Sequence, residues 1–413
     1  MTNSKYVYLD YAATTPMDPR VIEEVTKHFK ETYGNASSLH TLGQKAHQVL
    51  EKSREMVASL INADKDDIYF TSSGTESDNL AIKGVALKNQ DRGNHIITSA
   101  IEHHAVENPC SQLEKKGFKV SFLPVDKFGI INLDDLEKAI TDKTIFISIM
   151  FANNEIGTIE PIKEIGTIAK KNDIIFHTDA VQAFGKVPID VEEMNIDLLS
   201  ASSHKLYGPK GVGMLYIRNQ GKRKGWGKYI EPLLHGGGHE KKMRPSTENI
   251  PGIAGFAKAC EIAKEEMAVE AEKLINLRDK IIKWTIENIE DTYLNGHPTN
   301  RLPNNVNLGF KYVEGESILL SLDMEGIGAS TGSACSSTSL EASHVLLAIG
   351  LRSEEAQGSL RISLGKFTTE DEVEYFLEKL PPIIERLRKM SPLKKGVKYM
   401  FENAPETDNA HHH

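Results

Sequence analysis

Cysteine is scarce in this chain of 413 residues, and its three copies are widely separated. They are Cys110, Cys260 and Cys335, and no two of them form the Cys-x-x-Cys pair that is typical of structural zinc sites. An odd number of dispersed cysteines also argues against a disulfide framework. We therefore expect reduced thiols and no metal site.

Long apolar runs are absent as well. No segment approaches the roughly 20 apolar residues that cross a bilayer, and residues 1–10 lack the apolar core of a secretory signal. The sequence thus predicts a cytoplasmic protein without a membrane span. His411 to His413 resemble the remnant of a purification tag and carry no argument about metals.

Positive charge is not in excess. The chain has 49 Lys and Arg against 58 Asp and Glu, a net charge of −9 and a pI near 6.0. This balance disfavours nonspecific binding to nucleic acids or anionic membranes, although a local basic patch could still dock an RNA. We expect a small substrate and no direct nucleic-acid binding.

Short apolar, β-branched runs alternate with helix-like stretches through the first half of the chain. The runs are residues 68–71, 95–99, 119–124, 144–150, 174–177, 197–200 and 213–217. This alternation predicts an α/β fold whose mostly parallel sheet is covered by helices. The length exceeds one typical core, which indicates two domains.

The pattern changes near residue 250. A long helical stretch reaches residue 289, two more strands are expected at 305–308 and 359–363, and a capping sequence at 368–371 begins the closing helix. The polar tail after Phe401 has the composition of a disordered segment.

The tetrapeptide Ser202-Ser203-His204-Lys205 lies between two expected strands. A buried lysine loses its charge readily and becomes a nucleophilic amine, as a covalent link to an aldehyde cofactor requires. A lysine after a strand is more often a solvated charge. Lys205 therefore indicates pyridoxal phosphate only if other segments supply the rest of the site.

A phosphate seat is plausible where residues 71–76, Thr-Ser-Ser-Gly-Thr-Glu, join a strand to a helix. Free backbone N–H groups at the helix start, with Gly74 and Thr75, could hold a phosphate. An ordinary helix cap with a flexible glycine explains this stretch about equally well.

Residues 177–182 follow another strand and place an acid and an amide where open α/β sheets bind ligands. Asp179 could pair with a pyridinium nitrogen and keep the ring an electron sink, and Gln182 could bind its phenolic oxygen. Without Lys205, Asp179 would be interpreted as a loop-capping acid.

Two further polar segments end strands at the same predicted edge. In Glu102-His103-His104, His103 could stack on a cofactor ring and transfer protons, although a surface or core histidine is the simpler interpretation. Adjacent histidines cannot share one helix face, which disfavours a metal site from His103 and His104. In residues 153–157, Asn154 could contact the ring or substrate, but Asn-rich turns are usually structural.

These segments, together with residues 8–16, 75–79 and 235–240, resemble the cysteine desulfurases of the class-V aminotransferase family from Tyr8 to Leu393. Residues 330–337, Ser-Thr-Gly-Ser-Ala-Cys-Ser-Ser, resemble the active-cysteine loop of group I, the IscS/NifS-like group. The other main group usually carries Arg-x-Gly-x-His-Cys there.

The resemblance implies the pyridoxal-phosphate-dependent transferase fold of type I, with a seven-stranded sheet in the large domain and a smaller α+β domain. The implied bounds are 15–260 for the large domain, 1–14 and 261–400 for the small domain, 328–340 for the cysteine loop and 401–413 for the tail.

The resemblance also implies the site. Catalysis would rest on Lys205, Cys335 and His103, and the substrate would be held by Asn154 and Arg361. Cofactor binding is implied for Gly74, Thr75, His103, Asn154, Asp179, Gln182, Ser202, His204, Lys205 and, across a homodimer, Thr247. One departure is visible, because Arg244-Pro245-Ser246-Thr247 stands where the family usually has Arg-Ser-Gly-Thr.

The implied reaction converts L-cysteine to L-alanine and leaves the sulfur on Cys335 as a persulfide. Implied acceptors are an iron-sulfur scaffold protein, with transient cluster ligation through Cys335, and the machinery of tRNA thiolation. Cys110 and Cys260 are expected to be inert buried thiols.

Two alternatives stay open. An aminotransferase, β-lyase or selenocysteine lyase would need Lys205 but not Cys335. A catalytically silent binding module would be expected to lose Lys205, Asp179 or Cys335.

Overall fold

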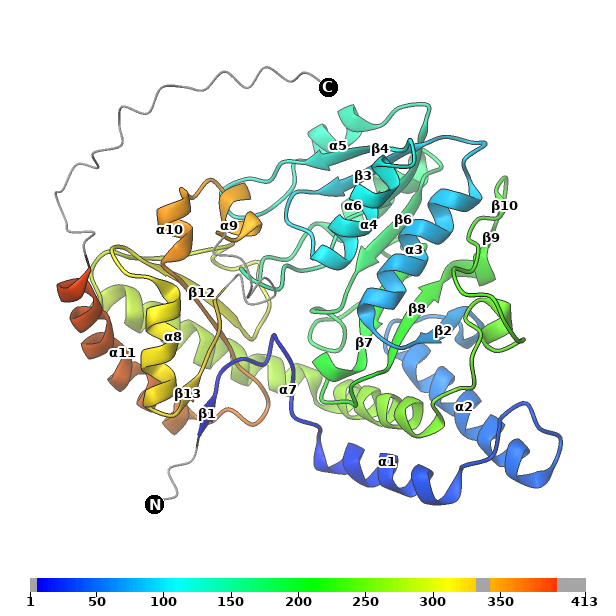
Figure 1. Cartoon of the computed structure of the whole chain (residues 1–413), viewed down its shortest axis with the longest axis horizontal. Helices are drawn as coiled ribbons and strands as arrows, with labels where there is room; N and C mark the ends of the chain where they lie inside the picture. Colours follow the sequence, from blue (N-terminus) through cyan, green and yellow to red (C-terminus); the bar gives the residue numbers. More distant parts are fainter. Residues whose placement is uncertain (1–5, 332–341, 392–413) are drawn as a thin grey trace.

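A seven-stranded sheet with strand order β2-β8-β7-β6-β5-β3-β4 is the centre of the larger lobe in the computed structural model, which describes residues 6–331 and 342–391 (Figure 1). Its strands are β2 (Ile68–Thr71), β3 (His95–Ser99), β4 (Lys119–Leu123), β5 (Thr144–Ser148), β6 (Ile175–Asp179), β7 (Leu198–Ser202) and β8 (Gly213–Ile217). Strands β4, β3, β5, β6 and β7 run parallel, and β8 is antiparallel to β7 and β2.

Burial explains why these runs form strands. Every residue of β3, β5, β6, β7 and β8 is buried, as expected for strands covered on both faces. The exception is β4, whose residues are mostly exposed or half-buried because it lies at the sheet edge.

Helices cover both faces of this sheet. One face packs against α3 (Gly74–Lys88) and α4 (His104–Glu114). The other face packs against α1 (Pro19–Glu31), α2 (Thr41–Ser59), α5 (Leu133–Ala139), α6 (Ile162–Lys171) and the first half of α7 (Ile250–Asn288). The expected α/β class with a helix-covered, mostly parallel sheet is therefore confirmed.

The smaller lobe is built on the antiparallel sheet β11-β12-β14. Its elements are β11 (Thr292–Leu294), β12 (Asn305–Phe310), α8 (Gly315–Met324), α9 (His344–Ala348), α10 (Ser353–Gln357), β14 (Ser359–Ser363) and α11 (Glu370–Met390). Thr369 caps α11 in a capping box with Glu372, which confirms the expected start of the closing helix.

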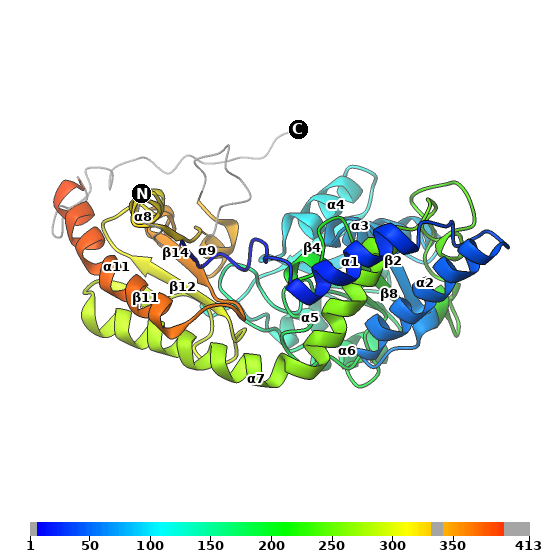
Figure 2. The same ribbon diagram turned by 90° about the horizontal axis from the view of Figure 1, so that it is seen from below.

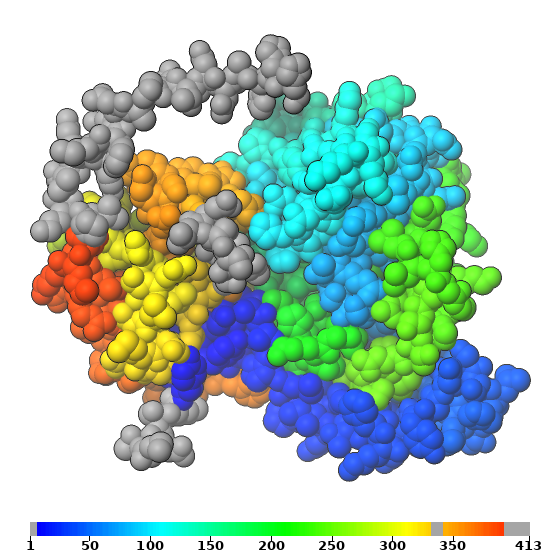
Figure 3. Space-filling view, in the orientation of Figure 1, coloured from blue at the N-terminus to red at the C-terminus, as the bar shows by residue number. Residues whose placement is uncertain are grey.

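Two segments connect the lobes. Helix α7 runs along both of them, and its buried residues up to Ala263 join the core under the large sheet, whereas Leu274 and Ile281 join the core of the small one (Figure 2). The N-terminal segment pairs through β1 (Val7–Tyr8) with β13 (Ile327–Gly328) and then passes between the lobes (Figure 3). The expected boundary at residue 260 falls inside α7, and the domain bounds stay a prediction.

No membrane span is found among the described helices, because none is long and apolar enough to cross a bilayer.

Candidate functional site

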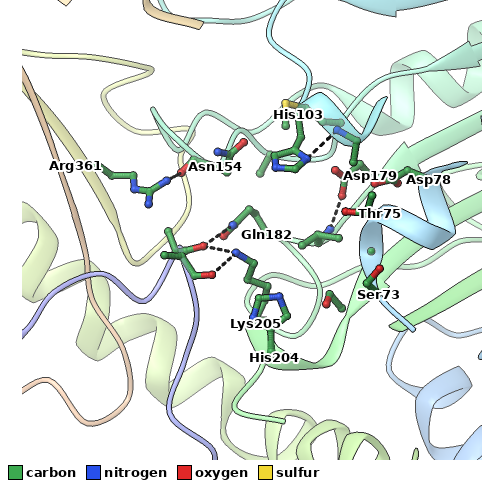
Figure 4. A pocket seen from close by; sticks show the side chains of 18 residues that line it. Ser73, Thr75, Asp78, His103, Asn154, Asp179, Gln182, His204, Lys205 and Arg361 are labelled. Atoms are coloured by element: carbon green, nitrogen blue, oxygen red, sulfur yellow. Dashed lines mark hydrogen bonds between the residues drawn. The ribbon is translucent and has the colours of Figure 1, made fainter. Parts of the chain in front are cut away.

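A cavity of about 290 Å³ opens where the carboxyl ends of the parallel strands meet the N-terminal segment and β14 (Figure 4). The predicted site residues that line it are Gly74, Thr75, His103, Asn154, Asp179, Gln182, Ser202, His204, Lys205 and Arg361. Thr247 is exposed and does not line this cavity, and Cys335 lies outside the described residues. The carboxyl ends of strands thus bring most of the predicted residues together.

Lys205 reaches the cavity from the turn that follows β7. Its Nζ donates hydrogen bonds to the backbone oxygens of Ala12 at 2.5 Å and Ala13 at 2.7 Å. Gln182 Nε2 donates to the same Ala12 oxygen at 3.0 Å, and Lys186 Nζ donates to Gln182 Oε1 at 3.3 Å. The N-terminal segment therefore positions both the amine and the amide, a role that the local sequence did not indicate.

The start of α3 lies where the phosphate seat was predicted. Ser73 caps the helix by accepting a hydrogen bond from Glu76 N at 3.1 Å, and Thr75 and Ser202 add hydroxyls to the cavity wall. A Cβ added to Gly74 would lie 2.6 Å from Val181 Cγ2, so only glycine fits there without a shift. The helix N-terminus favours an anion at this end of the cavity.

Asp179 ends β6 with its carboxylate fully buried and accepts a hydrogen bond from Val181 N at 2.9 Å. Burial raises the pKa of Asp179 to about 6. Behind it lies Asp78, which the sequence interpretation missed: burial and the charge of Asp179 raise the pKa of Asp78 well above its usual value. The ionised carboxylate of Asp179 favours a cation on its cavity side at neutral pH.

His103 is the N-cap of α4, and its Nδ1 accepts a hydrogen bond from Ala105 N at 3.1 Å. The neutral ring therefore carries its proton on Nε2. Burial, followed by the charge of Lys205, lowers the pKa of His103 to about 4, so the ring is uncharged at neutral pH. A flat uncharged ring in the cavity wall suits stacking and proton exchange.

Arg361 enters the cavity from β14 of the smaller lobe. Its Nη1 donates to Asn154 O at 3.1 Å, and its Nη2 donates to Asp10 Oδ1 at 3.0 Å. Its Nε is buried and has no hydrogen-bond partner among the described residues. Asp10, which sequence reasoning did not assign, thus orients a guanidinium in which these two hydrogen bonds use only two of five N–H groups.

The donor set fits pyridoxal phosphate. Hydroxyls and a helix N-terminus lie at one part of the cavity wall, a buried carboxylate faces it from β6, and a lysine amine reaches it from β7. These are the groups that a phosphate, a ring nitrogen and an aldehyde require. Asp179 would hold the ring nitrogen, and Lys205 would carry the aldehyde carbon.

The affinity for pyridoxal phosphate is expected to fall as pH drops below about 6. The pKa of Asp179 is raised, so its carboxylate takes up a proton through that window and loses its attraction for a ring cation. We expect a loss of up to about tenfold per pH unit, measured as the Kd of the cofactor-free protein between pH 7 and 5.

The matched control for this titration is Asp179→Asn. The cofactor phosphate also titrates near pH 6, and that contribution is the same in both proteins. The variant should bind more weakly at pH 7 and lack the part of the pH dependence that belongs to Asp179. Parallel titration curves for the two proteins would contradict this role.

The departure at Ser246 has a structural consequence. Ser246 adopts φ 130°, a backbone conformation that glycine adopts readily and serine does not. Such a residue costs about 1–3 kcal/mol of folding free energy. This explains why a glycine would suit the position, and the expected contact of Thr247 with a partner's phosphate stays a prediction.

Cys110 and Cys260 are buried and free, as expected. Burial raises the pKa of both thiols, which leaves them protonated and unreactive at neutral pH.

Comparison with known proteins gives consistent results over nearly the whole chain. The family model described as aminotransferase class-V matches residues 7–376. The cysteine desulfurase IscS of Methanosarcina thermophila is 55% identical over 392 residues, which cover 95% of this chain and 95% of that protein.

Solved structures show the same fold. A structure titled NifS-like protein superposes with a TM-score of 0.86 at 41% identity and covers 92% of this chain and 100% of its own. A structure of SspA in complex with cysteine has a TM-score of 0.77 at 38% identity, with coverage of 88% and 100%.

Proposed function

Because this chain belongs to the cysteine desulfurases of the class-V aminotransferase family, we propose that it transfers the sulfur of L-cysteine to Cys335. The net reaction turns L-cysteine and the Cys335 thiol into L-alanine and a Cys335 persulfide. The observation that carries the proposal is the convergence of Lys205, Asp179 and Arg361 on one cavity.

Holding the cofactor is the first task of the chain's residues. Ser73, Thr75, Ser202 and His204 supply the phosphate end, and Asp179 and Gln182 hold the ring. When bound, pyridoxal phosphate supplies an electron sink for the bonds that break at the substrate α-carbon. Lys205 would hold it covalently.

Orienting the substrate falls to the guanidinium of Arg361. Asp10 and the Asn154 carbonyl each accept one hydrogen bond from its terminal nitrogens, and the guanidinium has further N–H groups that would bind the carboxylate of L-cysteine. A fixed carboxylate limits how the α-carbon can present its proton and its side chain to the cavity.

Proton transfer is assigned to Lys205 and His103. The Lys205 amine lies in the same cavity and would take the α-proton of the substrate as a general base. His103 is neutral at pH 7 and carries a proton on Nε2, so it can exchange protons with substrate groups without first gaining a charge.

Sulfur leaves the site on Cys335. The thiolate attacks the substrate sulfur, an S–S bond forms, and the C–S bond breaks with its electron pair going to the alanine carbon skeleton. Glycine and serines around Cys335 suit a segment that collects sulfur and delivers it elsewhere.

The proposed partners rest on the resemblance to group I cysteine desulfurases. An iron-sulfur scaffold protein is the proposed acceptor, with transient cluster ligation through Cys335 and tRNA thiolation as a second destination. The exposed Thr247 would complete the phosphate site of a second copy in a homodimer. The cytoplasm is the proposed compartment.

The reaction is tested by identifying its products. The protein loaded with cofactor is incubated with L-cysteine without reductant, and intact mass and alanine are measured. We expect a gain of one sulfur atom per chain, removed by dithiothreitol, and one alanine per sulfur. Release of pyruvate and ammonia with sulfide would indicate a β-lyase instead.

A further inference from the structure

His104, Glu107 and His344 form a cluster outside the cavity described above. Their possible ligand atoms all lie within 4.8 Å of one another. Across residues 6–331 and 342–391, this is the one group of three or more His, Cys, Asp or Glu residues with that property. Two of them come from α4 and the third from α9, which is distant in sequence.

One ring nitrogen of His344 is held by a backbone carbonyl, which leaves the other with its lone pair. Its Nε2 lies 2.9 Å from the backbone oxygen of Glu102. A carbonyl oxygen only accepts, so Nε2 carries the proton and Nδ1 keeps its lone pair in the neutral ring. Metal-binding histidines typically donate their other N–H to a carbonyl or carboxylate in this way.

His104 and Glu107 lie one turn apart at the start of α4, with His104 Nδ1 2.8 Å from Glu107 Oε2. The ring of His104 lies 5.0 Å from the ring of His344. Ligands of a tetrahedral zinc, each about 2.0–2.1 Å from the ion, are roughly 3.3 Å apart. An ion can therefore replace the proton between His104 and Glu107 after these two atoms move slightly apart and the ligand atoms separated by up to 4.8 Å move closer.

We propose that His104, Glu107 and His344 bind one divalent cation of the zinc class, with a fourth position open to water. Two imidazoles and one carboxylate favour zinc and its neighbours over calcium and magnesium, which prefer oxygen ligands. The side chains of His104 and Glu107 are 42% and 37% exposed, so an ion can enter from solvent.

The ion would tie α4 to α9. The start of α9 already meets the larger lobe through Ser343, whose Oγ donates to Glu155 Oε2 at 2.5 Å, and through the His344 bond to Glu102. A metal adds a third connection, next to the N-cap residue His103. Occupancy is therefore expected to raise the melting temperature, and this inference does not depend on sulfur transfer.

The test is zinc binding by the full-length protein loaded with cofactor, followed by calorimetry. His411 to His413 are replaced by alanine throughout, because the tail histidines bind metals themselves. Glu107→Gln and His104→Gln are each expected to weaken the binding of one Zn²⁺ per chain at least about tenfold. Both should also lose the increase in melting temperature on adding Zn²⁺.

His47→Ala is the matched control, because this exposed histidine on α2 lies outside the cluster. Its zinc affinity should equal that of the parent. Co²⁺ provides a second readout, since its visible bands gain intensity in a tetrahedral site and should do so only with the cluster intact. Equal Zn²⁺ affinity and Co²⁺ spectra in the parent and in Glu107→Gln would overturn the proposal.

Discussion

Lys205→Ala is expected to abolish the covalent attachment of pyridoxal phosphate and to lower kcat for L-cysteine by at least about 10³-fold. In the structure, Lys205 is the lysine that lines the cavity, and the N-terminal segment holds its Nζ at two backbone oxygens. The variant loses the amine that is proposed both to carry the cofactor and to take the α-proton of the substrate. Borohydride reduction followed by intact mass measures the first loss, and alanine production measures the second.

Lys210→Ala is the control for this experiment. Lys210 lies five positions further along the same turn region and is exposed, so its loss should leave both readouts unchanged. The cofactor should still bind to Lys205→Ala noncovalently, because Asp179, Gln182 and the start of α3 are intact. A reducible covalent adduct in Lys205→Ala would show that another lysine carries the cofactor.

Cys335→Ala is expected to separate cofactor binding from sulfur transfer. The variant should bind pyridoxal phosphate with unchanged affinity, because Asp179, Gln182 and the start of α3, which are proposed to hold the cofactor, are intact. Its rate of alanine formation should fall at least about 10³-fold, since no thiolate accepts the sulfur. Intact mass after incubation with L-cysteine should show no added sulfur.

Ser333→Ala, in the same segment, is the matched control and should retain persulfide formation. Cys110 and Cys260 cannot take over in the Cys335 variant, because both are buried and their pKa values are raised. Undiminished turnover in Cys335→Ala would favour a lyase, and the proposed persulfide step would be wrong.

The strands of the large sheet were predictable because they are buried on both faces. Such strands appear in a sequence as short continuous apolar runs. The strands predicted at residues 68–71, 95–99 and 213–217 coincide with β2, β3 and β8. The ends of other predicted strands differ from the observed ends by one or two residues. The strand predicted at 174–177 is observed as β6, Ile175–Asp179, so Asp179 belongs to the strand itself.

Site residues at strand ends were predictable for a related reason. Parallel strands end at a common edge, so Asp179, Lys205 and His103 had to lie near one another once the sheet was accepted. Asp78 was missed because it lies within α3, and from sequence alone an acidic residue within a helix is expected on the solvent-exposed face. Only the packing of α3 on the sheet buries it behind Asp179.

The sequence by itself determined the alternation of strands and helices, the chemical types at the strand ends and the resemblance to a family, because these depend on neighbouring residues and short periods. Tertiary structure decided which groups touch. Three contacts join segments that are far apart in the chain: the hydrogen bond from Lys205 to Ala12, the ion pair of Arg361 with Asp10, and the ring contact of His104 with His344. Such contacts arise from how the lobes and the N-terminal segment pack, and no local pattern encodes them.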